Sequence, residues 1–236
     1  KIFPAVHYSM GGLWVDYDQM TEIPGLFAAG ECDYSQHGAN RLGANSLLSA
    51  IYGGMVAGPN AVKYIKGLKK HAEDLPETIF EARVKEETEK WEAILKMDGT
   101  ENAYLLHKEL GEWMTDNMTV VRHNDRLEKT YEKLTELQER WNNINVNDTQ
   151  RWSNQGAHFV RQLKNMLYLA KVMTKGALLR NESRGAHYKP EFPDRDDENF
   201  LKTTMAKFDP ATGEPIITYQ EVDVSLIPPR KRDYSA

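Results

Sequence analysis

Apolar residues recur three and four positions apart through most of residues 77–181, with charged and amide residues between them. This spacing places the apolar side chains on one face of a helix, so we expect four successive amphipathic helices. Their apolar faces comprise Phe80, Val84, Trp91 and Leu95; Leu106, Leu110 and Trp113; Leu127, Tyr131, Leu134, Leu137 and Trp141; and Phe159, Leu163, Met166, Ala170, Met173 and Ala177. Polar turns at residues 98–99 and 142–148 interrupt the pattern, which predicts an antiparallel helical bundle.

The N-terminal part has a different pattern. The apolar run at residues 26–29 predicts a short buried strand that ends at Gly30. A helix is expected from about residue 46, and Asn45 or Ser46 is a suitable N-cap. Gly53, Gly54 and Gly58 would let this helix pack closely against a sheet or a cofactor. Strand, loop and helix in this order are typical of an α/β domain.

The C-terminal part contains two short β-type runs. Residues 203–208 and 216–222 are separated by a segment with Asp209, Pro210, Thr212 and Gly213, residue types that favour turns. The pattern predicts a small β-hairpin that follows the helical bundle.

Composition excludes several classes of function. The formal net charge of −5 gives no support for nucleic-acid binding, and no apolar run approaches the about 20 residues that cross a membrane. A single cysteine, Cys32, excludes an internal disulfide, a cysteine-rich metal site and an iron–sulfur cluster held by this chain alone. We expect Cys32 to be a small buried residue, and we predict no metal site.

The loop after the predicted strand carries the candidate chemistry. Glu31 would lie at the strand's carboxyl end, where open α/β sheets bind ligands, and its carboxylate can accept hydrogen bonds from a polyol chain. Arg41 lies in the Gly- and Asn-rich loop that follows, and its planar fork of donors suits a carboxylate. The N–H groups at the next helix start also suit an anion. These features indicate an anionic organic ligand.

Three motifs carry a family resemblance. They are HYSMGG at residues 7–12, TEIPGLFAAGE at residues 21–31 and HGANRLGANS at residues 37–46. Together they resemble the flavoprotein subunit of succinate dehydrogenase and fumarate reductase, and NESRGAHYKPEFPDRDDENFL at residues 181–201 resembles the same family. The resemblance implies FAD as cofactor, with Glu31 on its ribityl chain and Ser46 and Leu47 beside the flavin. It also implies that His7 and Arg41 bind the carboxylates of succinate or fumarate.

The residue pattern and the resemblance together predict three parts along the chain. Residues 1–70 would be the C-terminal part of an FAD- and substrate-binding domain, residues 71–183 a spectrin-repeat-like helical bundle, and residues 184–236 an extended tail with the hairpin. The chain lacks a GxGxxG motif after a strand and reads as a fragment that is inactive alone. The family's proton-donating Arg would lie outside it, so no catalytic residue is assigned here.

The family's reaction supplies the expected function and partners. It interconverts succinate and fumarate by hydride transfer to or from FAD, and electrons pass through an iron–sulfur subunit to quinone at a membrane anchor. The chain itself would be peripheral, on the cytoplasmic side of the inner membrane, without inserting into it.

A charged group near the C-terminus has two interpretations. Glu182, Arg184, Arg195, Asp196 and Asp197 are expected to form structural charge pairs, and a contact surface for the iron–sulfur subunit is the alternative.

Two other functions stay open. L-Aspartate oxidase shares the HGANR-type loop, but Met10 favours the dehydrogenase because the oxidase usually has Cys at that position. The other alternative is a purely structural helical interaction module.

Overall fold

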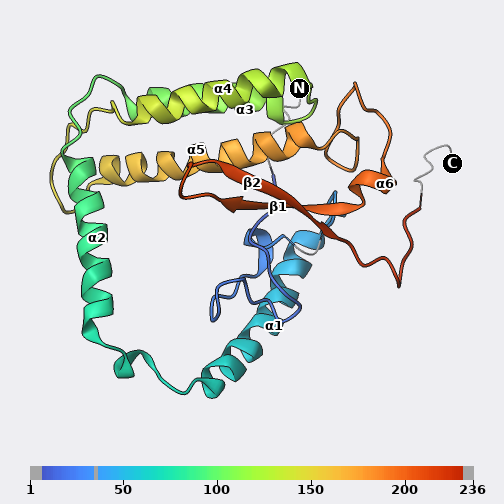
Figure 1. Cartoon of the computed structure of the whole chain (residues 1–236), viewed down its shortest axis with the longest axis horizontal. Helices are drawn as coiled ribbons and strands as arrows, with labels where there is room; N and C mark the ends of the chain where they lie inside the picture. The colour runs from blue at the N-terminus through green and yellow to red at the C-terminus, as the bar shows by residue number, and fades with distance from the viewer. Residues whose placement is uncertain (1–6, 35–36, 231–236) are drawn as a thin grey trace. The chain divides into compact units, whose positions relative to one another are not determined.

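A computed structural model describes residues 7–34 and 37–230 of the chain (Figure 1). The chain divides into two compact units, Lys1–Lys85 and Glu86–Ala236, and each is described by itself. The division into residues 1–70, 71–183 and 184–236 stays a prediction. Within the described residues, no helix is both long and apolar enough to cross a membrane.

The first unit consists of loops followed by the long helix α1, Asn45–Gly67, and the short 3-10 helices Gly30–Cys32 and Ala72–Asp74. The prediction of a buried strand at residues 26–29 is wrong. In the described chain this segment forms one isolated β-bridge, between Met20 and Phe27, and Leu26 is 44% exposed. A four-residue apolar run has no period that fixes a pairing partner. Here it pairs with the preceding tight loop, because Ala28 N–H donates to Gln19 O at 3.1 Å.

Helix α1 begins at Asn45, and the N-cap position belongs to Ala44 in the left-handed conformation (φ 65°). The expected cap by Asn45 or Ser46 is therefore wrong, and within the described residues no side chain caps this end. The predicted close packing is found at Gly53, because a Cβ added at this glycine would lie 3.0 Å from the Cβ of Ala29. It does not hold at Gly54 or Gly58, which face open space.

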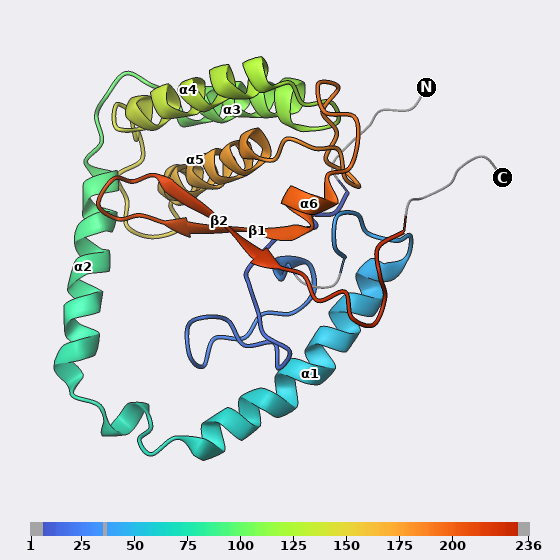
Figure 2. The same ribbon diagram turned by 45° about the vertical axis from the view of Figure 1, so that its right-hand side comes forward.

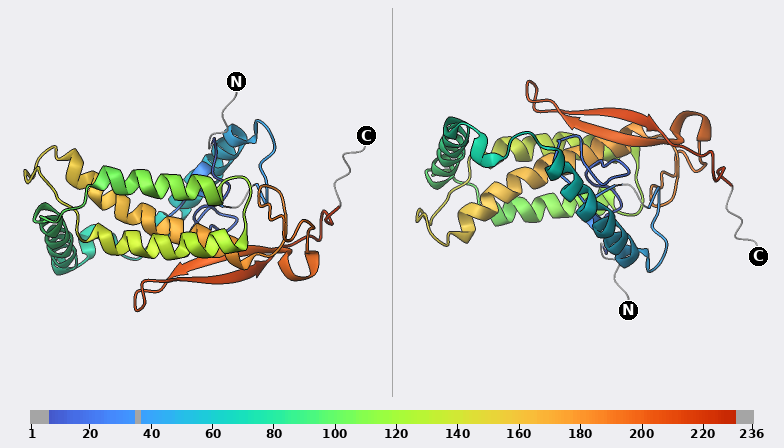
Figure 3. Two further views of the ribbon diagram at one scale, coloured as in Figure 1. Left: turned by 90° about the horizontal axis from the view of Figure 1, so that it is seen from above. Right: turned by 90° about the horizontal axis from the view of Figure 1, so that it is seen from below.

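The second unit is built on three long helices that lie side by side (Figure 3). They are α3, Ala103–Met118; α4, Asn124–Trp141; and α5, Gln155–Leu179. Asn102 caps α3 by accepting from Tyr104 N–H and Leu105 N–H, and Asn154 caps α5 by accepting from Ala157 N–H. The mainly helical fold is confirmed, whereas the likeness to a spectrin repeat is not.

Helix α2, Glu77–Leu95, joins this core only at its C-terminal end. Leu95 is buried and Trp91 packs against the core, whereas Phe80 and Val84 of the same predicted face are 47% and 65% exposed. The periodic pattern therefore predicted the helix correctly but not the length of its contact.

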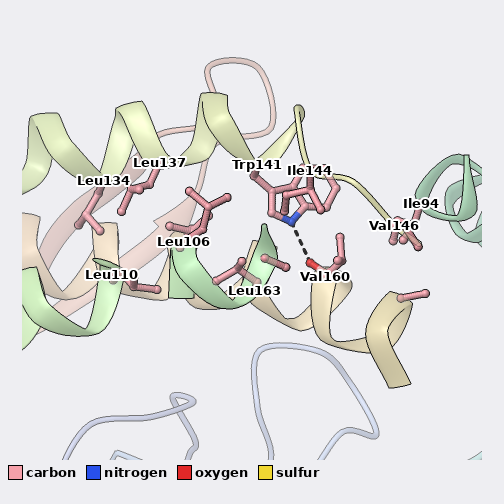
Figure 4. Packing of buried hydrophobic residues seen from close by; sticks show 14 of the residues in the cluster. Ile94, Leu106, Leu110, Leu134, Leu137, Trp141, Ile144, Val146, Val160 and Leu163 are labelled. Atoms are coloured by element: carbon pink, nitrogen blue, oxygen red, sulfur yellow. Dashed lines mark hydrogen bonds between the residues drawn. The ribbon is translucent and has the colours of Figure 1, made fainter. Parts of the chain in front are cut away.

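Figure 4 shows the packed centre of the second unit. Leu134, Leu137 and Leu163 are fully buried there, with Leu106 almost so. The Trp141 indole N–H donates to Val160 O at 2.8 Å, so the one polar atom of this large side chain is satisfied inside the apolar core.

The predicted hairpin is confirmed. Strands β1, Lys202–Phe208, and β2, Pro215–Glu221, are antiparallel, and the short helix α6, Asp197–Phe200, precedes them (Figure 2). Both strands contact α5. Gly213 supplies the positive φ (72°) that the turn requires.

Candidate functional site

The first unit brings two distant loops together. His7, Tyr8 and Met10 from one loop and Asn40 and Arg41 from the other line an open recess of about 160 Å³. His7 is exposed and Arg41 is half-buried. The structure therefore places the two predicted substrate-binding residues in the same recess.

Several contacts hold Arg41 in this recess. Its backbone N–H contacts Met10 Sδ at 2.9 Å, and its Nη1 donates to Leu42 O at 3.2 Å. The guanidinium carbon lies 4.9 Å from the centre of the Tyr8 ring. Among the described residues, Arg41 Nε is buried and has no hydrogen-bond partner. Buried donors are normally paired, so an unpaired cationic donor suits an anionic ligand.

Tyr8 links the recess to α1. Its hydroxyl lies 3.3 Å from Ser49 Oγ and 3.1 Å from His37 Nε2, and its ring meets the His37 ring edge-on at 5.2 Å. Sequence reasoning assigned no role to Tyr8 or His37. Their positions in the motifs could have indicated a role, because Tyr8 belongs to the motif that contains His7 and His37 to the motif that contains Arg41.

Glu31 lies in the 3-10 turn after Gly30 and is exposed. Its Oε1 accepts from Ser9 N–H at 2.9 Å. Leu13 N–H donates to Cys32 O at 2.7 Å, and a Cβ on Gly12 would lie 2.3 Å from that same oxygen. Only glycine at position 12 lets the two segments approach so closely. The Glu31 carboxylate keeps further lone pairs, which suit the hydroxyls of a ribityl chain.

Ser46 and Leu47 lie in the first turn of α1. Ser46 O accepts from Ser49 Oγ at 2.8 Å, and Leu47 is 74% exposed. Because no described side chain caps this turn, its N–H groups and partial positive charge are available to an anion. Leu48, Ile51 and Met55 continue an exposed apolar surface from Leu47. This combination fits a large ring system with an acidic edge, as in a flavin.

The expectation for Cys32 is wrong. This residue is exposed, and its Sγ contacts Ala29 O at 3.3 Å. The chain turns at Gly30–Cys32, and the Cys32 side chain therefore points outward. The prediction assumed an extended strand up to residue 29 and did not include this turn.

The charge pairs expected near residues 182–197 are confirmed. Glu182 is fully buried and accepts from Arg180 Nη1 at 2.6 Å, Arg184 Nε at 2.8 Å and Asp196 N–H at 2.9 Å. Arg184 and Arg195 also pair with Asp197, each at 2.7 Å. Asp196 has a different partner, because its Oδ1 caps α6 by accepting from Asn199 N–H.

One described group has atoms suited to a metal ion. His123, Asp125 and Glu191 have ligand atoms within 4.8 Å of one another. Glu191 Oε1, however, accepts from His123 Nδ1 at 3.0 Å and Asn124 N–H at 3.3 Å. Its carboxylate thus caps the positive N-terminus of α4, an arrangement that needs no ion.

A larger recess, of about 560 Å³, lies where α2 ends. Lys96, Asp98, Asn145 and Arg151 are among its lining residues, and Arg151 is paired with Glu92 at 2.7 Å. None of the predicted site residues lines it. The volume of a recess therefore does not identify the ligand site. The smaller recess contains Arg41 and His7, the two residues predicted to bind an anionic ligand.

Comparisons with known proteins give consistent matches. A family model described as "Fumarate reductase flavoprotein C-term" matches residues 107–234, and one described as "FAD binding domain" matches residues 1–47. The succinate dehydrogenase flavoprotein subunit of Bacillus subtilis is 72% identical over 235 residues, which cover 100% of this chain and 40% of that protein. The fumarate reductase flavoprotein subunit of Escherichia coli is 36% identical over 234 residues, covering 98% and 38%.

Solved structures give the same result. A structure of Escherichia coli quinol fumarate reductase matches with a TM-score of 0.89 and 36% identity, over 95% of this chain and 38% of the solved chain. The chain thus spans about 40% of the length of the curated relatives described here.

Proposed function

We infer the function of this chain from its family: it belongs to the flavoprotein subunits of succinate dehydrogenase and fumarate reductase. This membership confirms the resemblance in the sequence motifs and makes FAD the family's cofactor. We propose that the chain supplies part of the site at which succinate and fumarate are interconverted.

Arg41 and His7 are the proposed dicarboxylate ligands. The observation that carries this proposal is the recess that Arg41 and His7 line together, where Arg41 also has an Nε without a hydrogen-bond partner among the described residues. The guanidinium donates in its plane, where a carboxylate can accept two hydrogen bonds, and the imidazole can donate to a second carboxylate. This chain's residues would therefore bind and orient the substrate, and no proton donor is assigned among them.

Glu31, Ser46 and Leu47 are the proposed flavin contacts. When bound, FAD supplies the hydride acceptor or donor. Glu31 would accept hydrogen bonds from the ribityl hydroxyls, while the first turn of α1 would stabilise negative charge on the pyrimidine edge through its N–H groups. The exposed apolar side chain of Leu47 would contact the ring.

The partners are proposed from the family as well. Electrons would pass through an iron–sulfur subunit to quinone at a membrane anchor, with this polypeptide peripheral on the cytoplasmic side. The name of the Escherichia coli neighbour, a quinol fumarate reductase, supports the quinone partner. Because the chain spans only about 40% of its relatives, we propose that it is inactive alone.

The first test is Arg41→Lys in the full-length protein. Lysine keeps the charge but loses the bidentate fork, so we expect the KM for succinate to rise about 10- to 100-fold, with the FAD content per protein unchanged. Arg161→Lys, on the exposed side of α5, is the matched control and should leave the KM unchanged. An unchanged KM in Arg41→Lys would remove the proposed role.

The substrate class needs its own assay. Anaerobic, fumarate-dependent oxidation of a reduced viologen dye by the full-length protein with FAD should proceed, and oxygen-dependent oxidation of aspartate should not. Aspartate oxidation at a comparable rate would replace this proposal with the L-aspartate oxidase alternative.

A further inference from the structure

We propose that Tyr8 is the positioning residue for Arg41: its ring fixes the plane of the guanidinium, and its hydroxyl ties that ring to α1. This inference rests on the proposed function, because it gives Tyr8 a role in binding a dicarboxylate. It adds a residue that neither the motif resemblance nor the family matches assign.

Arg41 needs such a support because of where it lies. It belongs to a loop without helix or strand, and the backbone oxygen to which its guanidinium donates is that of Leu42, its own neighbour in the sequence. A long side chain on such a loop has many rotamers, and fixing one of them costs entropy at each binding event. A partner that holds the side chain beforehand removes part of that cost.

The Tyr8 ring has the geometry for this support. Its centre lies 4.9 Å from the guanidinium carbon, within the range of a cation–π contact. A ring that stacks on the face of a guanidinium leaves the N–H edges of that group for acceptors. Arg41 Nε, which has no hydrogen-bond partner among the described residues, is an edge donor, so the ring and a carboxylate ligand need not compete for the guanidinium.

The hydrogen bonds of Tyr8 have a defined direction. Ser49 Oγ donates its only proton to Ser46 O at 2.8 Å, so Tyr8 must donate to Ser49 Oγ. The Tyr8 oxygen then accepts from His37 Nε2, which assigns the Nε2–H tautomer to His37. Ser49 is buried in α1, so the ring that supports Arg41 is anchored to the rigid helix beneath the proposed flavin contacts.

The test uses the full-length, FAD-loaded protein and two substitutions. Tyr8→Leu removes the ring, and Tyr8→Phe keeps the ring but loses the hydroxyl. We measure the Kd of malonate from the change in flavin absorbance, together with the KM and kcat for succinate. Malonate is a dicarboxylate with a single methylene, so it has no CH2–CH2 unit to dehydrogenate. Tyr17→Leu, at a fully exposed tyrosine of the same unit, is the control.

For Tyr8→Leu we expect the malonate Kd and the succinate KM to rise about 3- to 30-fold, the range that a cation–π contact supplies, with FAD content unchanged. Tyr8→Phe should stay within about 3-fold of wild type because the ring is kept. If Tyr8→Leu loses flavin, Tyr8→Met, whose unbranched side chain of similar volume reaches farther along the position of the ring, replaces it with the same expectation.

A double-mutant cycle separates positioning from general packing. If Tyr8 acts through Arg41, adding Tyr8→Leu to Arg41→Lys should weaken malonate binding little further, whereas fully additive losses would overturn the proposal. An unchanged Kd in Tyr8→Leu, with normal malonate binding by the wild type, would overturn the role of Tyr8 alone. Failure of the wild type to bind malonate or to turn over succinate would overturn the proposed function and this inference together.

Discussion

Two cations in the second unit, one buried and one partly buried, donate to the carbonyl ends of helices. Lys189 is fully buried, and its Nζ donates to Leu178 O and Asn181 Oδ1, both at 3.0 Å, where α5 ends. Arg122 Nε donates to Met118 O at 3.0 Å, at the last residue of α3. The negative ends of the two helix dipoles thus stabilise positive charges, although burial still lowers the pKa of Lys189 to about 8.

His187 lies among these cations and has a defined protonation state. Its Nε2 contacts Arg180 O at 2.9 Å, so that nitrogen carries the proton, and Nδ1 accepts from Arg122 Nη1 at 2.5 Å. A proton on Nδ1 would turn this nitrogen into a donor, and it could then no longer accept the hydrogen bond from Arg122. Burial, together with the charges of Arg122 and Lys189, lowers the pKa of His187 to about 4.

We therefore expect His187 to make stability depend on pH. Between pH 4 and 6.5 the unfolded chain binds a proton at this residue and the folded chain does not, so the free energy of unfolding falls as pH falls through this window. From pH 7 to 5 the loss should be about 1–2 kcal/mol, allowing for partial exposure. Urea denaturation at both pH values should show this loss in the wild type and not in His187→Asn. Equal losses in both proteins would contradict the assignment.

Particular residues explain which parts of the fold were predictable at the level of elements. The bundle helices follow from side chains such as Leu134 and Leu163, which recur with helical period and are fully buried. The hairpin follows from turn residues that include Gly213. The N-cap of α1 did not follow, because Ala44 occupies that position through its backbone conformation and has no side-chain signal.

The candidate site was predictable to a different extent. His7 and Arg41 were found through motifs, and the structure brings them into one recess. The contacts of Tyr8 with His37 and Ser49 were not found, because these partners lie 29 and 41 positions away in the sequence, and the loop that holds Tyr8 has no periodicity from which a partner can be deduced. Residue types alone give no such long-range pairing.

The hairpin is held against α5 by an ion pair whose two ends differ in burial. Lys171 is almost fully buried and donates to Glu214 Oε1 at 2.6 Å, while Glu214 is partly exposed and also accepts from the Tyr131 hydroxyl. Removing the carboxylate leaves a buried ammonium without its partner. Removing the ammonium leaves a carboxylate that water can reach.

We therefore expect Glu214→Gln to lower the free energy of unfolding by about 1–3 kcal/mol. Lys171→Met should lower it by less. Chemical denaturation of both variants measures the difference. Glu221→Gln, at the other end of the hairpin, is the matched control: Glu221 pairs with Lys202 at 3.2 Å but is 80% exposed, so its loss should stay within about 0.5 kcal/mol. A larger loss in Lys171→Met than in Glu214→Gln would contradict this account.

At the scale of the whole molecule, buried contacts are distributed unevenly between the two units. The two hydrophobic clusters found among the described residues lie between Ile94 and Ala177, in the second unit. Helix α5 has eight buried residues, whereas α1, of similar length, has two, Ser49 and Gly53. The apolar side chains of α1 face outward instead, beginning at Leu47.

This distribution predicts a difference in local stability. Amide protection depends on the free energy of local opening, which rises with buried apolar contact, so amides of α4 and α5 should exchange more slowly than those of α1. Hydrogen exchange followed by mass spectrometry on the 236-residue chain measures both. The first turns of α2, where Phe80 and Val84 are exposed, serve as an internal reference and should exchange as fast as α1. Protection of α1 equal to that of α5 would mean that the stability of these helices does not depend on buried apolar contact, and would contradict this prediction.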